Sequence, residues 1–418
     1  MKKYFPILIL FLLPETVHAY LDPGSGAMLI NLIVASIAAS FYYMKDYFFR
    51  IFSKEKKINQ QKPKVSILSE GHQYWSTFKP IIDAMIQQQI PFCYYTLDIH
   101  DPALTIENDL MHSKFLGYSS WANSRASLIK SDVLLATTPN IGNHGFPLKR
   151  PPSVIEMVHV FHSINDISAY KTGSLDAYDS VIIVGDFQID SIRKIEKQRN
   201  LKAKKLLPLG LPYLDELVKE KTHKTYSNLN NKETVLIGSS WGSKGCLQSY
   251  GTDFIKQIVQ HGYNVIIRPH PQSFKSEKKI IKKFKEELRH ISNIEWDESI
   301  SSSISMHKAD ILISDTSSIR FDFAFLYKKP VITLNIEKDK MVGFEREHLE
   351  EIWTDKSSSK IGFVVERSSI NQLPSIIEKT LSEFDLSSIH QLRDNTIHNF
   401  GESGIAIAKY LSEKNNNI

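Results

Sequence analysis

From residue 64 almost to the C-terminal end, short aliphatic and β-branched runs alternate with longer stretches whose apolar positions recur at helical spacing. The short runs predict strands at residues 64–69, 92–97, 132–138, 153–163, 180–185, 234–240, 264–270, 293–297, 309–314 and 330–335. The longer stretches predict helices at residues 70–88, 186–200, 251–262, 276–290, 319–327, 373–384 and 403–411. This alternation predicts parallel sheets covered by helices.

A polar segment, residues 221–233, divides the alternating pattern into two series and predicts a domain boundary. We therefore predict an α/β fold with two Rossmann-like domains that face a cleft. The first, on the acceptor side, covers residues 61–222, and the second, which binds the nucleotide donor, covers residues 232–400. A terminal helix and tail follow at residues 401–418. Open α/β sheets bind ligands at the carboxyl ends of their strands, so functional side chains are expected directly after strands.

The first 60 residues have a different character. Residues 1–19 combine two lysines with a short apolar run and resemble a signal peptide. Residues 20–60 hold the stretch YLDPGSG, an apolar run at 27–44 that is long enough to span a bilayer, and a basic segment after it. The basic residues place the remaining chain on the cytoplasmic side of the inner membrane. The first segment is either cleaved or retained as half of a hairpin, so the anchor is single-pass or a hairpin.

The composition narrows the class of ligand. The 418 residues carry a net charge of +5, a mild excess that suits anionic ligands or a membrane surface. No basic cluster interleaved with aromatic residues appears, which argues against a nucleic-acid partner. The cysteines, Cys93 and Cys246, have neither metal-ligand nor disulfide spacing, and no metal site is predicted.

Arg268 and His270 follow a predicted strand in the stretch IIRPHPQS, where two prolines stiffen the loop. Arginine offers a rigid fork of donors for phosphate oxygens, and histidine can donate to a phosphate or act as an acid. The alternative is a surface loop whose arginine pairs with an acidic neighbour.

A run of small hydroxyl residues and a carboxylate lies between a strand and a helix in ISDTSSIRFDF. Helix-start N–H groups and the macrodipole together favour an anion. We expect the substrate-binding side chains to be Ser314, Asp315, Thr316, Ser317 and Ser318, with Asp322 one turn further along. The alternative is simple capping of the helix.

Two histidines, His159 and His162, close the apolar run EMVHVFHSIND. Positions three apart on a strand point to opposite faces, so the two imidazoles have different roles. We predict that His159 packs in the core and that His162, nearer the loop, is a catalytic base or else structural. Weaker candidates for substrate binding are His72, in a turn after the first strand, and Trp241, in a Gly/Ser-rich turn that does not match a P-loop.

Taken together, the stretches FHS, LPLGLPYLDEL, GSSWG, RPHP and LISDTSSIRFDFAFLYKKPVIT resemble the CDP-glycerol glycerophosphotransferase family. Its members build teichoic-acid-like and capsular polymers of the cell envelope on a two-domain GT-B fold. The resemblance covers roughly residues 154–334. By motif, His162 matches the family's base, while Arg268, His270 and the Ser317–Ser318 helix start match its pyrophosphate-binding groups. The chain departs from the family in its Phe-His-Ser-Ile loop, where the family has Trp-His-Gly-Thr, and in having Thr316 in place of an aromatic residue.

The resemblance implies a membrane-anchored transferase, active without a cofactor, that moves glycerol phosphate or a related polyol phosphate from a CDP-polyol donor such as CDP-glycerol. The acceptor would be a hydroxyl of a lipid-linked or growing polymer, and CMP would be released. In this interpretation Arg268 and His270 act with His162 as catalytic residues. The alternatives are a glycosyltransferase or nucleotide-sugar epimerase on the same fold, and a non-catalytic module that binds a nucleotide-activated precursor.

Overall fold

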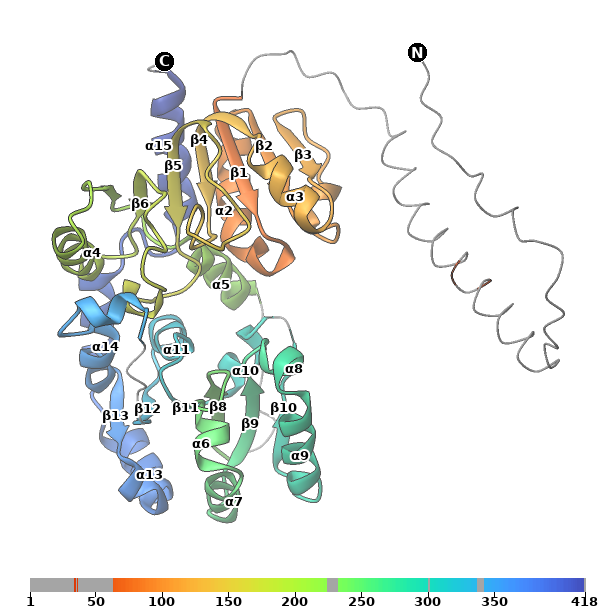
Figure 1. Cartoon of the computed structure of the whole chain (residues 1–418). Helices are drawn as coiled ribbons and strands as arrows, with labels where there is room; N and C mark the ends of the chain where they lie inside the picture. The colour runs from red at the N-terminus through yellow and green to blue at the C-terminus, as the bar shows by residue number, and fades with distance from the viewer. Residues whose placement is uncertain are drawn as a thin grey trace, which may run out of the picture. The chain divides into compact units, whose positions relative to one another are not determined.

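The computed structural model describes Val34, Ser36 and residues 63–223, 232–299, 301–336 and 342–416. The chain divides into two units, residues 1–61 and 62–418, and the second carries the fold (Figure 1). Within these described ranges, no helix has the length and apolar character needed to cross a membrane. The predicted signal-like segment and membrane span lie outside the described residues apart from Val34 and Ser36, and they stay predictions.

The first sheet has seven strands in the order β3-β2-β1-β4-β5-β6-β7. All of its pairings are parallel. The order steps outward in one direction from β1 and then reverses from β4, which is the doubly wound pattern. The strands are β1 (Val65–Ser69), β2 (Phe92–Thr96), β3 (Met111–Phe115), β4 (Lys130–Ala136), β5 (Ser153–Val160), β6 (Ser180–Ile182) and β7 (Lys205–Leu207).

The second sheet repeats this plan with six parallel strands in the order β10-β9-β8-β11-β12-β13. Its strands are β8 (Thr234–Ser239), β9 (Asn264–Pro269), β10 (Ile294–Trp296), β11 (Ile311–Ser314), β12 (Val331–Leu334) and β13 (Gly362–Val365). The predicted α/β fold with two parallel-sheet, Rossmann-like domains is therefore confirmed. The cleft between them stays a prediction.

Helices cover the sheets because successive strand residues point to opposite faces and both faces are apolar. In the first domain these are α2 (Trp75–Gln87), α3 (Ser119–Ala126), α4 (Phe187–Gln198) and α5 (Pro212–His223). The second domain has α6 (Cys246–Tyr250), α7 (Asp253–Gln260), α8 (Ser273–Ser276), α9 (Lys278–Leu288), α10 (Ser303–Lys308), α11 (Ile319–Tyr327), α12 (Trp353–Lys356) and α13 (Leu373–Glu383). Two further helices, α14 (Ser387–Thr396) and α15 (Ser403–Asn416), end the described chain.

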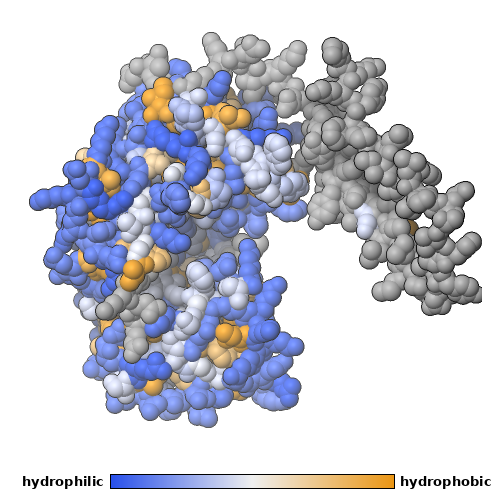
Figure 2. All heavy atoms as spheres, viewed as in Figure 1, coloured by the Kyte–Doolittle hydropathy of each residue, from blue (hydrophilic) through white to orange (hydrophobic). Residues whose placement is uncertain are grey.

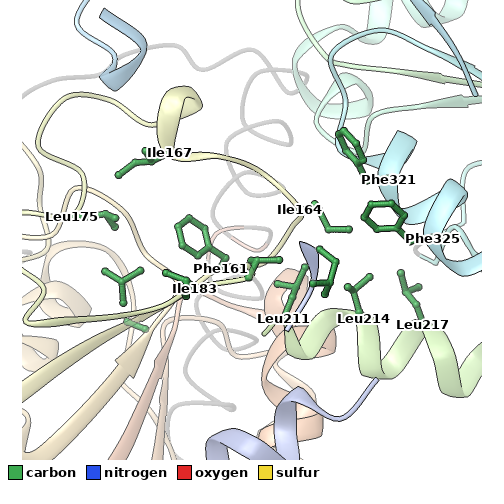
Figure 3. Close-up of a cluster of buried hydrophobic side chains, with 14 of the residues drawn as sticks. Phe161, Ile164, Ile167, Leu175, Ile183, Leu211, Leu214, Leu217, Phe321 and Phe325 are labelled. Carbon is green, nitrogen blue, oxygen red and sulfur yellow. The ribbon is translucent and has the colours of Figure 1, made fainter. Parts of the chain in front are cut away.

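One hydrophobic cluster is shared by the two sheets. It takes Leu134 and Met157 from the first sheet and Leu236 and Leu312 from the second. Between the sheets, Figure 3 shows α5 presenting leucines and α11 presenting phenylalanines to the same apolar space. The buried side chains drawn there include Phe161, Ile164, Leu211, Leu214, Leu217, Phe321 and Phe325. The two domains are therefore joined by a continuous apolar core.

The segment between β12 and β13 also connects the domains. Glu345, almost fully buried, accepts hydrogen bonds from the Gly173 N–H at 2.8 Å and from Arg199 at 3.2 Å, both in the first domain. Further along, the Thr354 hydroxyl donates to the Asp166 carboxylate at 2.9 Å. This segment of the second domain is thus bonded to the loops that follow β5 in the first.

The last helix returns to the first domain, where Figure 1 shows α15 beside β4 and β5. Ile407, Ala408 and Leu411 of α15 pack in one cluster with Phe78 and Ile81 of α2. The N–H groups of Ser403 and Gly404 donate to the buried Asp215 carboxylate at 3.1 and 2.7 Å. A carboxylate at a helix N-terminus is favourable, so this contact fixes where α15 begins.

Gly210, in the stretch LPLGLPYL, lies between β7 and α5 and packs against the segment between α14 and α15. Its φ is +88°, and a Cβ there would lie 2.1 Å from the carbonyl oxygen of His398. We expect Gly210→Ala to lower the free energy of unfolding by about 2 kcal/mol or more, because left-handed strain adds to a backbone clash. Urea denaturation measures this loss.

Gly262→Ala is the matched control. Its φ is +97°, but a Cβ there would meet nothing within 4 Å, so only the conformational strain of about 1 kcal/mol should appear. Equal losses in the two variants would contradict the packing described at Gly210.

Candidate functional site

Asp315 joins two loops at the carboxyl end of the second sheet. It follows β11 and is fully buried. Its carboxylate accepts hydrogen bonds from the Ser240 N–H at 3.0 Å and from the Cys246 N–H at 2.6 Å, both after β8. It also accepts from the Ser317 N–H at 3.1 Å. β8 and β11 flank the point where the strand order reverses, and doubly wound folds bind ligands at that point.

The hydroxyl run around Asp315 divides into a buried and an accessible part. Ser314 is buried and its hydroxyl donates to the Gly238 carbonyl. Thr316 is exposed, and Ser317 and Ser318 are half-buried directly before α11. Because the Ser317 N–H bonds Asp315, capping by this carboxylate is present here. An anion at this helix start would be bound by the three accessible hydroxyls and the N–H groups that follow.

Arg268 lies at the end of β9 with its side chain 8% exposed. It forms an ion pair with Asp297 at 2.6 Å and contacts the Ser299 hydroxyl at 3.3 Å. The acidic neighbour considered as the alternative is thus present. The pair fixes the plane of the guanidinium, and with it the direction of the other N–H groups.

His270, two residues on, is held by its own loop. Its Nδ1 accepts a hydrogen bond from the Gln272 N–H at 3.0 Å. In the neutral imidazole the proton is therefore on Nε2, which can donate to an anion. Burial lowers the pKa of His270, and Arg268 lowers it further, against the opposing effects of Asp315 and Glu277.

The candidate base His162 belongs to the first domain and follows the end of β5. Burial lowers its pKa to about 4, and the charge of His270 adds to the shift. The ring of Tyr74 contacts it edge-on at 5.2 Å between centroids. Its buried Nδ1 has no hydrogen-bond partner within the part of the chain that the structure describes.

The neighbouring histidine, His159, has a different environment. It is fully buried, its Nε2 lies 3.2 Å from the Tyr170 hydroxyl, and the Phe161 and Tyr178 rings pack on it. Burial lowers its pKa to about 3, and His162 adds to the shift. The prediction that His159 is a packed core histidine is confirmed.

Asp322 lies beneath the site on α11 and is 4% exposed. Burial raises its pKa to about 7, and its Oδ1 has no hydrogen-bond partner among the described residues. Burial raises the pKa of Tyr213 on α5, and the charge of Asp322 adds to that shift. In this structure Asp322 is beneath, rather than at, the accessible surface of the loop.

The two weaker candidates lie elsewhere. Trp241, 56% exposed, is on the loop whose N–H groups bond Asp315, where Glu277 accepts from the Gly242 N–H at 2.8 Å. His72 is exposed and its Nδ1 pairs with Asp98 in the turn after β1. Arg268, His270 and the Ser317–Ser318 helix start therefore lie at the carboxyl end of the second sheet and His162 follows β5 of the first, while His72 pairs with Asp98.

Sequence reasoning missed two polar groups at the site. Arg320, 1% exposed, donates to the Ser317 carbonyl at 3.1 Å and to the Ser358 hydroxyl at 2.7 Å, which fixes the helix start from beneath. Burial lowers its pKa to about 10. Glu70 follows β1 directly, and burial raises its pKa. Burial raises the pKa of Tyr74 to about 12, and the charge of Glu70 adds to that shift. Its position at a strand end was the signal for Glu70.

Part of the chain that holds this site matches a known family model. Residues 143–341 match the family model of CDP-glycerol:poly(glycerophosphate) glycerophosphotransferase. This span contains His162, Arg268, His270 and residues 314–318, and it confirms the resemblance predicted from the sequence. A search of the curated proteins gave no match.

Solved structures show the same fold. The UDP-GlcNAc 2-epimerase of Methanocaldococcus jannaschii, in complex with UDP-GlcNAc and UDP, is 14% identical with a TM-score of 0.52, and the match covers 84% of this chain and 99% of that one. S. aureus MnaA bound to UDP is 12% identical with a TM-score of 0.54 and coverages of 85% and 98%. The UDP-GlcNAc 2-epimerase of Neisseria meningitidis bound to UDP-GlcNAc is 14% identical, with a TM-score of 0.53 and coverages of 85% and 100%.

Asp322→Asn tests the cost of the buried carboxyl group. The pKa of Asp322 is about 7 in the folded chain and near 4 in the unfolded chain. The stability linked to its protonated form is therefore fully present below pH 4 and is lost as the pH rises through 7. The asparagine variant has no such loss. We expect its free energy of unfolding to match that of the wild type near pH 4 and to exceed it by up to about 4 kcal/mol at pH 8.

Chemical denaturation of both proteins at pH 4, 6 and 8 measures this difference, in which the contributions of the other titrating groups cancel. A difference that does not change with pH would contradict the buried, unpaired state of Asp322.

Proposed function

We propose that this chain is a glycerophosphotransferase that moves glycerol phosphate, or a related polyol phosphate, from CDP-glycerol to a hydroxyl group of a lipid-linked or growing cell-surface polymer. The observation that carries the proposal is the fixed donor group at the carboxyl end of the second sheet, Arg268, His270 and the Ser317–Ser318 helix start, inside the span that matches the family model. Two domains each contribute one imidazole, as a reaction between a donor and a separate acceptor requires.

In the proposed reaction the acceptor oxygen attacks the donor phosphorus next to glycerol. A new oxygen–phosphorus bond forms, the bond from that phosphorus to the CMP oxygen breaks, and its electron pair leaves with CMP. His162 takes the proton of the acceptor hydroxyl. Its low pKa keeps it neutral, and able to accept a proton, at neutral pH. Bound phosphates would raise this pKa, because a nearby negative charge favours the protonated form.

The second-domain residues act on the phosphates. The His270 Nε2–H, the guanidinium of Arg268 and the Ser317–Ser318 helix start supply donors for the charge that develops on departing CMP. Their positions are fixed before substrate arrives: Arg268 is paired with Asp297, His270 with the Gln272 N–H, and the helix start with Asp315. Preorganised donors of this kind stabilise the transition state without reorganising during the reaction.

A membrane anchor would hold the enzyme close to a lipid-linked acceptor. We propose that residues 20–60 hold the chain at the inner membrane and that the catalytic part faces the cytoplasm, where CDP-polyols would be the donors. We propose teichoic-acid or capsule assembly as the setting, because the description of the matching family names a poly(glycerophosphate) polymer.

The fold supports a second candidate, an enzyme that acts on a nucleotide sugar. The solved structures with the same fold include 2-epimerases bound to UDP-GlcNAc and UDP. In that case the chemistry would occur at sugar carbon, and CDP-polyols would not be consumed.

Nucleotide release distinguishes these candidates. Detergent-purified full chain would be mixed with native membrane lipids and, separately, with CDP-glycerol, CDP-ribitol, UDP-sugars or GDP-sugars. We expect CMP release with a CDP-polyol alone. His162→Ala should slow this release by about 10²- to 10⁴-fold, the usual contribution of a general base, with donor binding retained.

His261→Ala is the matched control, because His261 is exposed and its ring bonds the carbonyl of its own helix. It should leave the rate unchanged. Near-full turnover in His162→Ala would remove the assigned base, UDP or GDP release would favour the second candidate, and donor binding without turnover would favour a non-catalytic module.

A further inference from the structure

Helix α3 and the residues beside it expose large apolar side chains. Tyr118, Trp121 and Leu128 are 54%, 74% and 74% exposed. Trp121 lies within α3, Tyr118 directly precedes the helix, and Leu128 follows its end by two residues. Ala122 and Ala126 of the same helix are buried against the first sheet. The small residues of α3 thus pack inward, while the large apolar residues of this segment are exposed.

These outward positions are structured. The Tyr118 ring packs edge-on against Phe115 at 5.0 Å between centroids. The Arg125 side chain, in register with Trp121 and Leu128, donates to the Leu116 carbonyl at 2.9 Å. The Leu128 N–H bonds the Arg125 carbonyl at 3.0 Å, which continues the helical turn to that residue. The face is therefore a defined surface.

The charged residues of this segment are basic. Residues 111–131 contain Lys114, Arg125 and Lys130 and no aspartate or glutamate. All three basic residues are exposed. Figure 2 shows the surface over α3 as pale and weakly polar beside the blue of its surroundings. We name Tyr118, Trp121, Leu128 and these three basic residues the Trp121 surface.

The Trp121 surface lies at a free edge of the first sheet, since α3 follows β3, the outermost strand. The chain enters the same domain at β1 after a long N-terminal segment. If the bilayer span ends at residue 44, as predicted, about 20 residues separate it from Val65, and they reach at most about 70 Å. The first domain is then confined to the neighbourhood of a bilayer.

We propose that the Trp121 surface binds the face of an anionic lipid bilayer. Tryptophan and tyrosine favour the membrane interface because their rings are apolar with one polar end. Lysine and arginine beside them bind the acidic headgroups, and their apolar stems extend along the same surface. The proposal does not depend on the reaction assigned to the protein, because lipid contact is measured without turnover.

The test uses the full chain in vesicles and places a fluorophore on Leu128→Cys, with Ile405→Cys as the control site. Ile405 is 54% exposed and lies on α15, which covers the opposite face of the first sheet. We expect nitroxide-labelled lipids to quench the fluorophore at position 128 in vesicles containing phosphatidylglycerol, and to leave position 405 unquenched.

Two variants identify the chemistry of the contact. Lys130→Ala should lower the bound fraction at position 128 by about fivefold in phosphatidylglycerol vesicles, because one surface charge is lost. In pure phosphatidylcholine it should change the bound fraction little. Trp121→Ala should reduce quenching in both lipids. Equal quenching at the two sites would overturn the proposal, since the anchor alone would explain it. A blue-shifted emission at position 128 without lipid quenching would also overturn it, in favour of a protein that covers this surface.

Discussion

The buried carboxylate of Asp315 is the constraint on which the site depends. A fully buried charge is costly unless hydrogen bonds satisfy it, and here the donors come from two loops that are about 75 residues apart in sequence. Its bonds to Ser240 and Cys246 fix the turn after β8, and its bond to Ser317 fixes the start of α11. The accessible hydroxyls are thus held in place by a charge that has little direct access to solvent.

The relative placement of His162 and His270 depends on contacts far from them. His162 and His270 belong to different sheets, so their separation is set by how the domains join. The shared apolar core around Leu214 and Phe321 sets this join, and the bonds of Glu345 to the first domain add to it. Because packed cores are not continuously deformable, the relative position of the two imidazoles is set in the absence of any ligand.

Local pattern predicted the alternation of strands and helices and the positions of residues after strand ends, because apolar periodicity reports burial directly. It missed β3, β7 and β13, and polar β3 lies at a sheet edge where little burial is needed. It also could not predict partners distant in sequence. Asp297 lies 29 residues from Arg268, and nothing near either residue indicates the pair. The packing of α15 against the first sheet was missed for the same reason.

The return of α15 bears on how the chain folds as it is synthesised. The cluster that α2 forms with the first sheet is completed by Ile407, Ala408 and Leu411, which are synthesised after the second domain. Phe78 and Ile81 belong to the first quarter of the chain, so the whole second domain is synthesised before their partners on α15. During that interval the apolar face of the first sheet is incompletely covered, a state in which exposed apolar surface favours aggregation. We therefore expect chaperones to bind the nascent first domain until α15 has been synthesised.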